Sequence, residues 1–464
     1  MVTFGDTGLK VAVVGCGHGM LDTIYATLEV ECATKGWAQI DLDLLIICGD
    51  FQAVRNELDL NCMSVPKHYR KLGDFHKYYS GAAQAPVLTL VIGGNHEASN
   101  YHFELYHGGW LAPNIYYLGA AGVVRYGPWR IAGVSGIYNT RSYGKPHGER
   151  LPYDRDSVRS AYHVREYDVQ RLLHLRSPVD IALSHDWPAW VELFGDHDDF
   201  YKTKPHFFAS ALADRLGSKP AAELLSHLRP TYWFSGHMHT RFAATVNFHD
   251  GLGMEDALQR LDNVPEKLRA VLPRVPRSKK PPTPPASTAT KTEFLALDKV
   301  GSNPTFQWLE VRNLDHPPHA DSPDAAPYLD RTEAGKYSLH YDEEWLAVTR
   351  ACAPGLNIAD PVTLVVAPST ARKVPAASVD KHRRWVKANI VDKKLLQIPF
   401  NFAPHAPVYS PGSEVDQNQQ PLEYPNQQTA QFYDLLQIPN RFAVSSPADA
   451  SGEGGSASEV GMDR

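Results

Sequence analysis

The chain has 464 residues, of which 43% are hydrophobic and 10% aromatic, and it carries a formal net charge of −6. This composition is typical of a globular protein with a substantial core, and the acidic balance disfavours a general polyanion-binding protein. Any nucleic-acid contact must therefore come from a local basic surface. The five cysteines lack CxxC spacing, and no secretory or membrane-spanning pattern is found, so we expect an intracellular protein in a reducing compartment.

Three aliphatic runs in the first hundred residues predict buried strands. They are Leu9–Val14, Leu42–Cys48 and Leu90–Ile92, and helical spacing over Leu21–Ala38 separates the first two. This β-α-β-α-β rhythm predicts a mostly parallel sheet with helices packed on it. Each run ends in glycine and then polar side chains that can bind a metal or carry a proton. These side chains are Cys16 and His18, then Asp50, then Asn95, His96 and Glu97.

Further strand-like runs follow the same pattern. They are Trp129–Val134, Ile181–Ser184 and Tyr232–Ser235, and the last two lead into His185 and into Gly236-His237-Met238-His239. A single histidine is more often structural than functional, and His68, His76, His174 and His227 fit that background. Five strands that each end in a potential ligand instead favour a shared site, because the carboxyl ends of parallel strands meet at one edge.

The donor types indicate which metal such a site would hold. Imidazoles with one carboxylate and one amide oxygen suit a divalent transition metal, whereas calcium takes mostly oxygen donors. The two oxygens of Asp50 could bridge two ions about 3.5–4 Å apart. The residues therefore predict a two-metal hydrolase site.

The order of these motifs resembles that of the calcineurin-like metallophosphoesterases. The motifs are Cys16-Gly17-His18, Gly49-Asp50, Gly94-Asn95-His96-Glu97, His185 and Gly236-His237-Met238-His239. Cysteine stands where that superfamily usually has aspartate, as in its subfamily of RNA lariat debranching enzymes. Landmarks around residues 133–139, 162–168, 294–299, 341–346, 398–402 and 426–429 are also similar to that subfamily. The resemblance spans roughly residues 9 to 440.

The resemblance implies a fold and a set of roles. The expected fold is α/β, with a β-sandwich-type phosphoesterase core, flanking helices and a smaller C-terminal domain. One metal would be held by His18, Asp50 and His239 with Cys16 near or bound to it, and the other by Asp50, Asn95, His185 and His237. His96 would be the general acid, and Glu97 would orient a histidine. The thiol of Cys16 is either a ligand or a group that fills space against the sheet.

The implied reaction is metal-dependent hydrolysis of the 2′-5′ phosphodiester at the branch of an excised intron lariat. The phosphate would stay on the 5′ end and the branch nucleotide would gain a free 2′-OH. The implied cofactors are two divalent transition-metal ions, Fe, Zn or Mn. Expected partners are branched RNA and intron-turnover or spliceosomal factors, with a monomeric nuclear protein. The alternatives are a phosphoesterase acting on another nucleic acid or a phosphoprotein, and a metal-free scaffold.

Residues 134–167 combine aromatic and cationic side chains, which suit stacked bases and phosphates. They are Tyr138, Arg141, Tyr143, Lys145, His147, Arg150, Tyr153, Arg155, Arg159, Tyr162, His163 and Arg165. We predict that this segment is a lariat recognition loop, with RNA contacts at Tyr138, Arg141, Tyr143, Arg159, Tyr162, His163 and Arg165. A solvated loop with structural tyrosines is the alternative.

The expected domains are a catalytic domain over 1–257, a Pro-rich and basic linker over 258–292, a C-terminal domain over 293–443 and a disordered tail over 444–464. The basic cluster Arg274, Arg277, Lys279 and Lys280 is either a nuclear localisation signal or plain linker. In the C-terminal domain, Phe294–Leu309 has strand character, and we expect it to return to the main sheet. Helices are predicted over Glu343–Thr349 and His382–Leu396.

Overall fold

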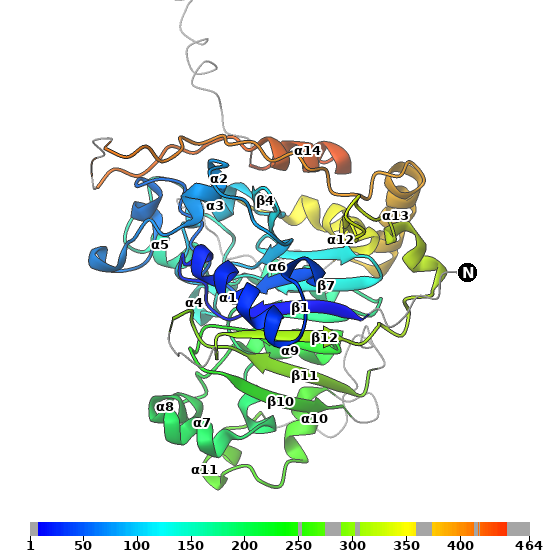
Figure 1. Cartoon of the computed structure of the whole chain (residues 1–464). Helices are drawn as coiled ribbons and strands as arrows, with labels where there is room; N and C mark the ends of the chain where they lie inside the picture. Colours follow the sequence, from blue (N-terminus) through cyan, green and yellow to red (C-terminus); the bar gives the residue numbers. More distant parts are fainter. Residues whose placement is uncertain are drawn as a thin grey trace, which may run out of the picture.

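The computed structural model describes residues 8–248, 253–273, 289–301, 307–358, 374–412, 416 and 418–442. Two mixed β-sheets pack face to face, and helices cover their outer faces (Figure 1). The predicted α/β class with a β-sandwich core and flanking helices is confirmed.

The first sheet has six strands in the order β12-β1-β2-β3-β5-β4. Their bounds are β12 Leu309–Leu314, β1 Leu9–Val14, β2 Leu44–Ile47, β3 Thr89–Val91, β5 Ile115–Tyr117 and β4 Gly109–Ala112. The four inner strands are parallel, and the two edge strands run antiparallel to them.

The second sheet has seven strands in the order β10-β11-β9-β8-β7-β6-β13. Their bounds are β10 Phe242–Asn247, β11 Lys291–Ala296, β9 Tyr232–Ser235, β8 Ile181–Ser184, β7 Trp129–Val134, β6 Ala121–Tyr126 and β13 Leu339–Tyr341. The strands β7, β8, β9 and β11 are parallel, so this sheet also has one edge at which several carboxyl ends meet.

The inner strands are buried on both faces, which explains why their sequences are mostly apolar and do not alternate with polar residues. In β1, Val11 and Val13 point into the core between the sheets, whereas Ala12 and Val14 point toward the helices outside. Full burial of one valine contributes about 1.5 kcal/mol or more, so a register shift of one residue in this strand would cost several such contacts.

Helices pack on both outer faces. The first sheet is covered by α1 (Leu21–Thr34), α2 (Phe75–Tyr79) and α3 (Ser99–Glu104), and the second by α6 (Glu166–Leu173), α9 (Lys219–Leu228) and α12 (Glu343–Cys352). Shorter or peripheral helices are α4 (Thr140–Tyr143), α5 (Ser157–Ser160), α7 (His197–Thr203), α8 (Pro205–Leu212), α10 (Met254–Gln259), α11 (Glu266–Arg269), α13 (Ala376–Val386) and α14 (Gln427–Leu436). The start of α9 is capped by Ser218, whose hydroxyl accepts a hydrogen bond from the Ala221 amide at 3.2 Å.

The predicted strands Leu9–Val14, Trp129–Val134, Ile181–Ser184 and Tyr232–Ser235 have these same bounds in the structure. The predicted strand character of Phe294–Leu309 and its return to the main sheet are confirmed at the two ends of this range, where β11 ends at Ala296 and β12 begins at Leu309. The prediction did not indicate that these strands join different sheets: β11 pairs with β9 and β12 pairs with β1. A local pattern of apolar residues cannot indicate that the chain crosses from one sheet to the other.

The region after residue 289 is built into the catalytic core through β11, β12 and β13. The helix α14 adds a further contact, because the Gln428 side chain donates to and accepts from the Trp110 backbone at 2.9 and 2.8 Å. Figure 1 shows α14 at one end of the molecule, with α2, α3 and β4 below it. The helix predicted over Glu343–Thr349 is confirmed within α12. The one predicted over His382–Leu396 is helical only to Val391, where a π-helical turn ends.

The described part of the predicted linker is folded. Within residues 258–273, Val264 and Leu268 are buried in the core beside the second sheet, so this stretch is not a linker. Residues 274–288, with the basic cluster, and the predicted tail 444–464 lie outside the described residues. Across the described parts of the chain, no helix combines the length and apolar character that crossing a membrane requires.

Candidate metal centre

The predicted ligands come together where the carboxyl ends of parallel strands from both sheets meet. Cys16, Asp50 and Asn95 follow β1, β2 and β3 of the first sheet, whereas His185 and His237 follow β8 and β9 of the second. The Trp187 indole donates to the Gly236 carbonyl at 2.8 Å and ties the loops of the second sheet together.

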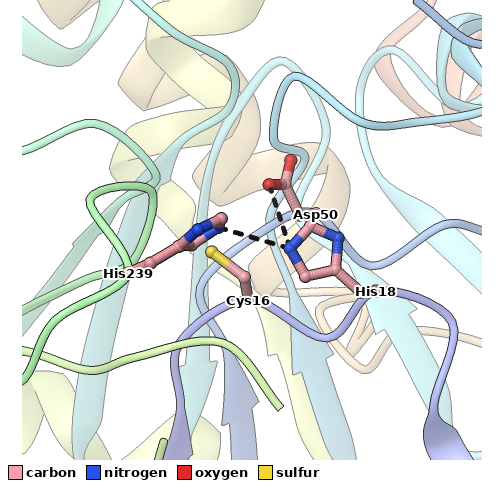
Figure 2. A group of neighbouring side chains, drawn as sticks. All are labelled: Cys16, His18, Asp50 and His239. Carbon is pink, nitrogen blue, oxygen red and sulfur yellow. Dashed lines mark hydrogen bonds and ion pairs between the residues drawn. The ribbon is translucent and has the colours of Figure 1, made fainter. Parts of the chain in front are cut away.

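One cluster contains Cys16, His18, Asp50 and His239, whose side chains point toward one another in Figure 2. Their possible ligand atoms all lie within 4.8 Å of one another. The Nε2 atom of His18 is 3.3 Å from Nε2 of His239 and 3.8 Å from Oδ2 of Asp50. One thiol, two imidazoles and one carboxylate form a donor set that fits a divalent transition metal.

A second cluster adjoins the first through Asp50. The Nε2 atom of His185 lies 3.3 Å from Oδ1 of Asp50 and 3.2 Å from Oδ1 of Asn95, and the ring centroids of His185 and His237 are 5.0 Å apart. The two oxygens of Asp50 thus face different histidines. This is the arrangement that a carboxylate bridging two ions requires.

The two histidine rings nearest to Asp50 are held in position by neighbouring groups. The Nδ1 atom of His185 lies 2.7 Å from the Cys48 carbonyl oxygen and can only donate to it, so Nε2 keeps its lone pair toward Asp50. The side-chain amide of Gln52 lies 3.3 Å from Nδ1 of His18 and restrains that ring. The sequence did not single out Gln52 or the Cys48 carbonyl, because both act through contacts between separate loops.

The electrostatics leave the ligands ready to bind a cation. Burial raises the pKa of Asp50, but the surrounding histidines, His185 foremost, outweigh it and hold that pKa below its usual range. Burial lowers the pKa of both His185 and His239 to about 4, so these rings are neutral at pH 7. Burial, and then the Asp50 charge, raises the pKa of the Cys16 thiol, so binding of a metal through Cys16 must displace a proton.

Four of the predicted ligands have backbone angles that L-residues rarely adopt. The φ angles are +46° at His18, +46° at Asp50, +67° at His237 and +47° at His239. Each such residue costs on the order of 1 kcal/mol or more, and such conformations concentrate at functional sites. The loop after β1 is held in this form by hydrogen bonds to the loop after β2, including His18 N to the Asp50 carbonyl at 2.6 Å.

Two glycines are required by close approach rather than by flexibility alone. A Cβ atom at Gly94 would overlap with the backbone nitrogen and the carboxylate of Asp50, and one at Gly49 would overlap with the His185 ring. Gly49 also has a φ of +100°. The glycine before each polar motif therefore makes room for the ligand of a neighbouring loop.

The role of Glu97 differs from the prediction. Its buried carboxylate accepts hydrogen bonds from the backbone amides of Phe51, Gln52 and Gly94 at 2.7–2.8 Å. It thus holds the loop after Asp50 against the loop before Asn95 instead of orienting a metal-binding histidine. Burial, followed by the charge of Asp50, raises the pKa of Glu97, whereas the three amide donors favour the carboxylate and oppose that rise.

Replacing Glu97 by glutamine should destabilise the protein and weaken metal binding. An amide has only one acceptor oxygen, and its NH2 group would face a backbone N–H, so about 1–3 kcal/mol of unfolding free energy is expected to be lost. Urea unfolding and metal content measure the two effects. Glu333→Gln, a substitution at an exposed glutamate, is the matched control. Wild-type stability in Glu97→Gln would contradict the assigned role.

His96 stands apart from both clusters. Its backbone amide donates to Oδ1 of Asp50 at 2.8 Å, and its ring centroid lies 5.5 Å from that of His18. The half-buried imidazole forms no hydrogen bond within the described residues. It therefore borders the metal cluster with its ring nitrogens available to a substrate.

The predicted RNA contacts occupy different environments in the structure. Arg141 and Arg159 are exposed, whereas Tyr138, Tyr143, Tyr162 and His163 are half-buried. Tyr138 packs edge-on against Tyr143 at 5.6 Å, and its amide donates to Asp186, the neighbour of His185, at 3.4 Å. The recognition loop thus begins directly beside the second cluster.

The prediction for Arg165 needs correction. Its side chain is 1% exposed and donates to the carbonyls of Ser142 and Ser160 at 3.1 and 2.9 Å and to the carboxylate of Glu149. A buried guanidinium with these partners holds the loop together and is not available to RNA. The aromatic and basic composition of the loop could not separate this structural arginine from the exposed ones.

Two lysines near the site were not predicted. The Nζ atom of Lys204 donates to the His239 carbonyl at 3.0 Å. Lys299 follows β11, and its charge adds to the effect of burial in lowering the pKa of His18 and of His239. Both lysines come from segments remote from the motifs, so the sequence carried no signal for them.

Two family models match the chain. Residues 9–241 match the calcineurin-like phosphoesterases, and residues 289–441 match the C-terminal domain of lariat debranching enzymes. The second match begins at β11, where the chain returns to the sheets.

Several curated proteins are similar over nearly the whole chain. The lariat debranching enzyme of Arabidopsis thaliana is 39% identical, covering 93% of this chain and 87% of that protein. The Homo sapiens enzyme is 40% identical, over 93% of this chain and 69% of its own length. The Schizosaccharomyces pombe enzyme is 37% identical, over 95% and 98%.

Proposed function

Because the chain belongs to the lariat debranching enzymes, a family of calcineurin-like phosphoesterases, we propose that it hydrolyses the 2′-5′ phosphodiester at the branch of lariat RNA. The observation that carries the proposal is the pair of clusters that share Asp50. A two-metal phosphoesterase needs such a shared carboxylate. Every predicted ligand position also carries a residue that can bind a metal, which disfavours a scaffold that has lost its metals.

The family uses divalent metal ions, and the donor set fits Fe, Zn or Mn. One ion would be held by Cys16, His18, Asp50 and His239. The other would be held by Asp50, Asn95, His185 and His237. When bound, the ions supply a hydroxide nucleophile at neutral pH and neutralise charge on the phosphate.

The remaining chemistry falls to groups of this chain. His96 protonates the departing 2′ oxygen, because its imidazole borders the cluster without joining it. Lys299 forms a backbone bridge with Cys16, so its positive charge lies near the first cluster and favours binding of the phosphodiester. Tyr138, at the start of the predicted recognition loop, is positioned to meet the branch nucleotide, and the exposed side chain of Arg141, which has no partner among the described residues, is suited to bind phosphate.

The test is cleavage of a synthetic branched RNA beside its linear 3′-5′ counterpart. We expect the branched RNA to be cleaved, with a 5′ phosphate on the released strand and a 2′-OH on the branch nucleotide. Equal cleavage of the linear RNA, or of a phosphopeptide, would contradict specificity for the branch. Mass spectrometry of the products distinguishes these outcomes.

We also propose that the protein acts as a monomer in the nucleus and meets intron-turnover or spliceosomal factors there. The proposal follows from the substrate, because excised lariats arise where introns are removed. Localisation of a fluorescent fusion tests it, and exclusion of the fusion from the nucleus would contradict it.

The identity of the metal should depend on Cys16. Its Sγ atom is buried in the first cluster and accepts a hydrogen bond from the His237 amide at 3.1 Å. Because a carboxylate is a harder ligand than a thiolate, Cys16→Asp should shift metal preference from Zn and Fe toward Mn. Elemental analysis after equilibration with a metal mixture measures this. Unchanged metal ratios in Cys16→Asp would show that the thiol does not act as a ligand.

A further inference from the structure

A groove outside the metal centre is lined by cations from three separate segments. It has a volume of about 420 Å³ and lies between residues 61–70, residues 153–159 and residues 418–420. Four cations line it, Lys67, Arg70, Arg155 and Arg159, against the single carboxylate of Asp154. That carboxylate accepts hydrogen bonds from Ser157 and the Asp156 amide.

Hydrogen bonds between the three segments give the groove a fixed shape. The Gln420 side chain accepts from the Tyr153 amide and donates to the Tyr153 carbonyl, both at 2.7 Å. The side-chain amide of Asn61 donates to the Gln419 carbonyl at 2.7 Å, and Nζ of Lys67 donates to Oδ1 of Asn418 at 2.6 Å. The walls therefore do not depend on a single flexible loop.

The positive charges in the groove are not neutralised by acidic side chains of the described residues. Arg155 and Arg159 are exposed, and neither guanidinium has a hydrogen bond or ion pair with the described residues. Arg70 is aimed by hydrogen bonds to the Val65 carbonyl and the Asn61 side chain, both at 3.1 Å. The groove thus offers several positive charges whose natural counterpart is a polyanion.

An exposed aromatic residue, Tyr69, directly precedes the lining residue Arg70 in the chain. Tyr69 is 65% exposed, and it lies in the stretch Pro66-Lys67-His68-Tyr69-Arg70-Lys71 with its ring centroid 4.0 Å from that of His68. An exposed tyrosine among lysines and arginines matches the way proteins hold single-stranded nucleic acid, with bases stacked on the ring and phosphates on the cations.

The wall of the groove packs against the loops that carry metal ligands. Its wall residues Met63 and Val65 pack with Val54 and Ala98, which belong to the loops that follow Asp50 and Asn95. The Ser64 hydroxyl lies 3.4 Å from that of Tyr162, at the end of the recognition loop. The loops that follow Asp50 and Asn95 thus pack against one wall of the groove, and the predicted recognition loop forms another wall through residues 153–159.

We propose that this groove binds a single-stranded arm of the branched RNA, with Tyr69 stacking on a base and Arg155 and Arg159 contacting phosphates. The inference rests on the proposed function. It adds a binding site for the nucleotides that lie beyond the branch. An acidic protein segment is the competing occupant, but its carboxylates would contact the cations without stacking on the exposed ring of Tyr69, as a base does.

The test compares two substrates, a branched trinucleotide and a branched RNA whose arms are about 10 nucleotides long, within the reach of one such site. Tyr69→Ala and Arg155→Ala should each lower kcat/KM for the long-armed RNA by about 10-fold, the loss expected from one stacked base or one phosphate contact. Arg155→Ala should also reduce the salt slope by about 0.7. Tyr69→Phe keeps the ring and should restore turnover, and Arg260→Ala, an exposed arginine beside α10, is the matched control.

A loss confined to the long-armed RNA supports the proposal. An equal loss on the trinucleotide would overturn it, because the residues would then act on the fold or the metal centre. Unchanged turnover of both substrates would also overturn it and would favour an acidic protein segment. Failure of the wild-type enzyme on both substrates would instead contradict the proposed function and is distinguishable from either result.

Discussion

Replacing Asp50 by asparagine is expected to remove metal from both clusters and to lower branched-RNA cleavage by at least about 10³-fold, since the charge it supplies to bound cations is worth several kcal/mol. The reason is its position. One oxygen faces His18 and the other faces His185, at 3.8 and 3.3 Å, so this carboxylate is shared by both clusters. An asparagine keeps the shape but supplies no charge.

The measurement is elemental analysis of the purified protein together with turnover of branched RNA. Asp43→Asn is the matched control, because Asp43 precedes the same strand β2 and pairs with Lys336 at the opposite end. We expect the control to keep its metal and its activity. Full metal content in Asp50→Asn would mean that the two clusters bind metal independently of the shared carboxylate.

His96→Ala should lower turnover of branched RNA by about 10²–10⁴-fold while metal content stays unchanged. The imidazole lies beside His18 without belonging to either cluster, so its removal takes away an acid and leaves every ligand in place. This separates His96 from Asp50, whose loss affects metal and catalysis together.

The choice of leaving group gives the sharper test of the acid role. A p-nitrophenyl phosphodiester releases an anion that needs no proton, so His96→Ala should lose far less activity on that ester than on branched RNA. His206→Ala, an exposed histidine on α8, is the matched control. Equal losses on both substrates would sink the acid assignment and indicate that His96 acts in binding or in positioning Asp50.

The sequence by itself determined the strands and the ligands at their ends. Runs such as Leu44–Ile47 are aliphatic throughout because both faces of the strand are buried, and that pattern is local. The glycines at the strand ends can also be read from the sequence, but the reason for Gly49 and Gly94 is tertiary, since they make room for His185 and Asp50 from other loops. The resemblance added the order of the motifs and the identity of the family.

The sequence was less informative about the recognition loop. The sequence does not distinguish Arg159 from Arg165, because both lie in the same basic, aromatic segment. In the structure Arg159 is exposed, whereas Arg165 is buried against Glu149. The same holds for Tyr69, which lies outside the predicted loop and becomes a candidate only because residues 153–159 and 418–420 fold beside its segment.

Only the tertiary structure decided how the ligands divide and how the C-terminal region joins them. The first three ligand-bearing loops follow one sheet and the last two follow the other, so the metal centre forms only when the sheets pack together. The segment after β11 forms a backbone bridge between Lys299 and Cys16, which brings Lys299 near His18 although roughly 280 residues separate them in the chain. Local patterning specifies which faces are buried, but not which distant strand will pair with an edge, because that choice depends on packing across the whole molecule.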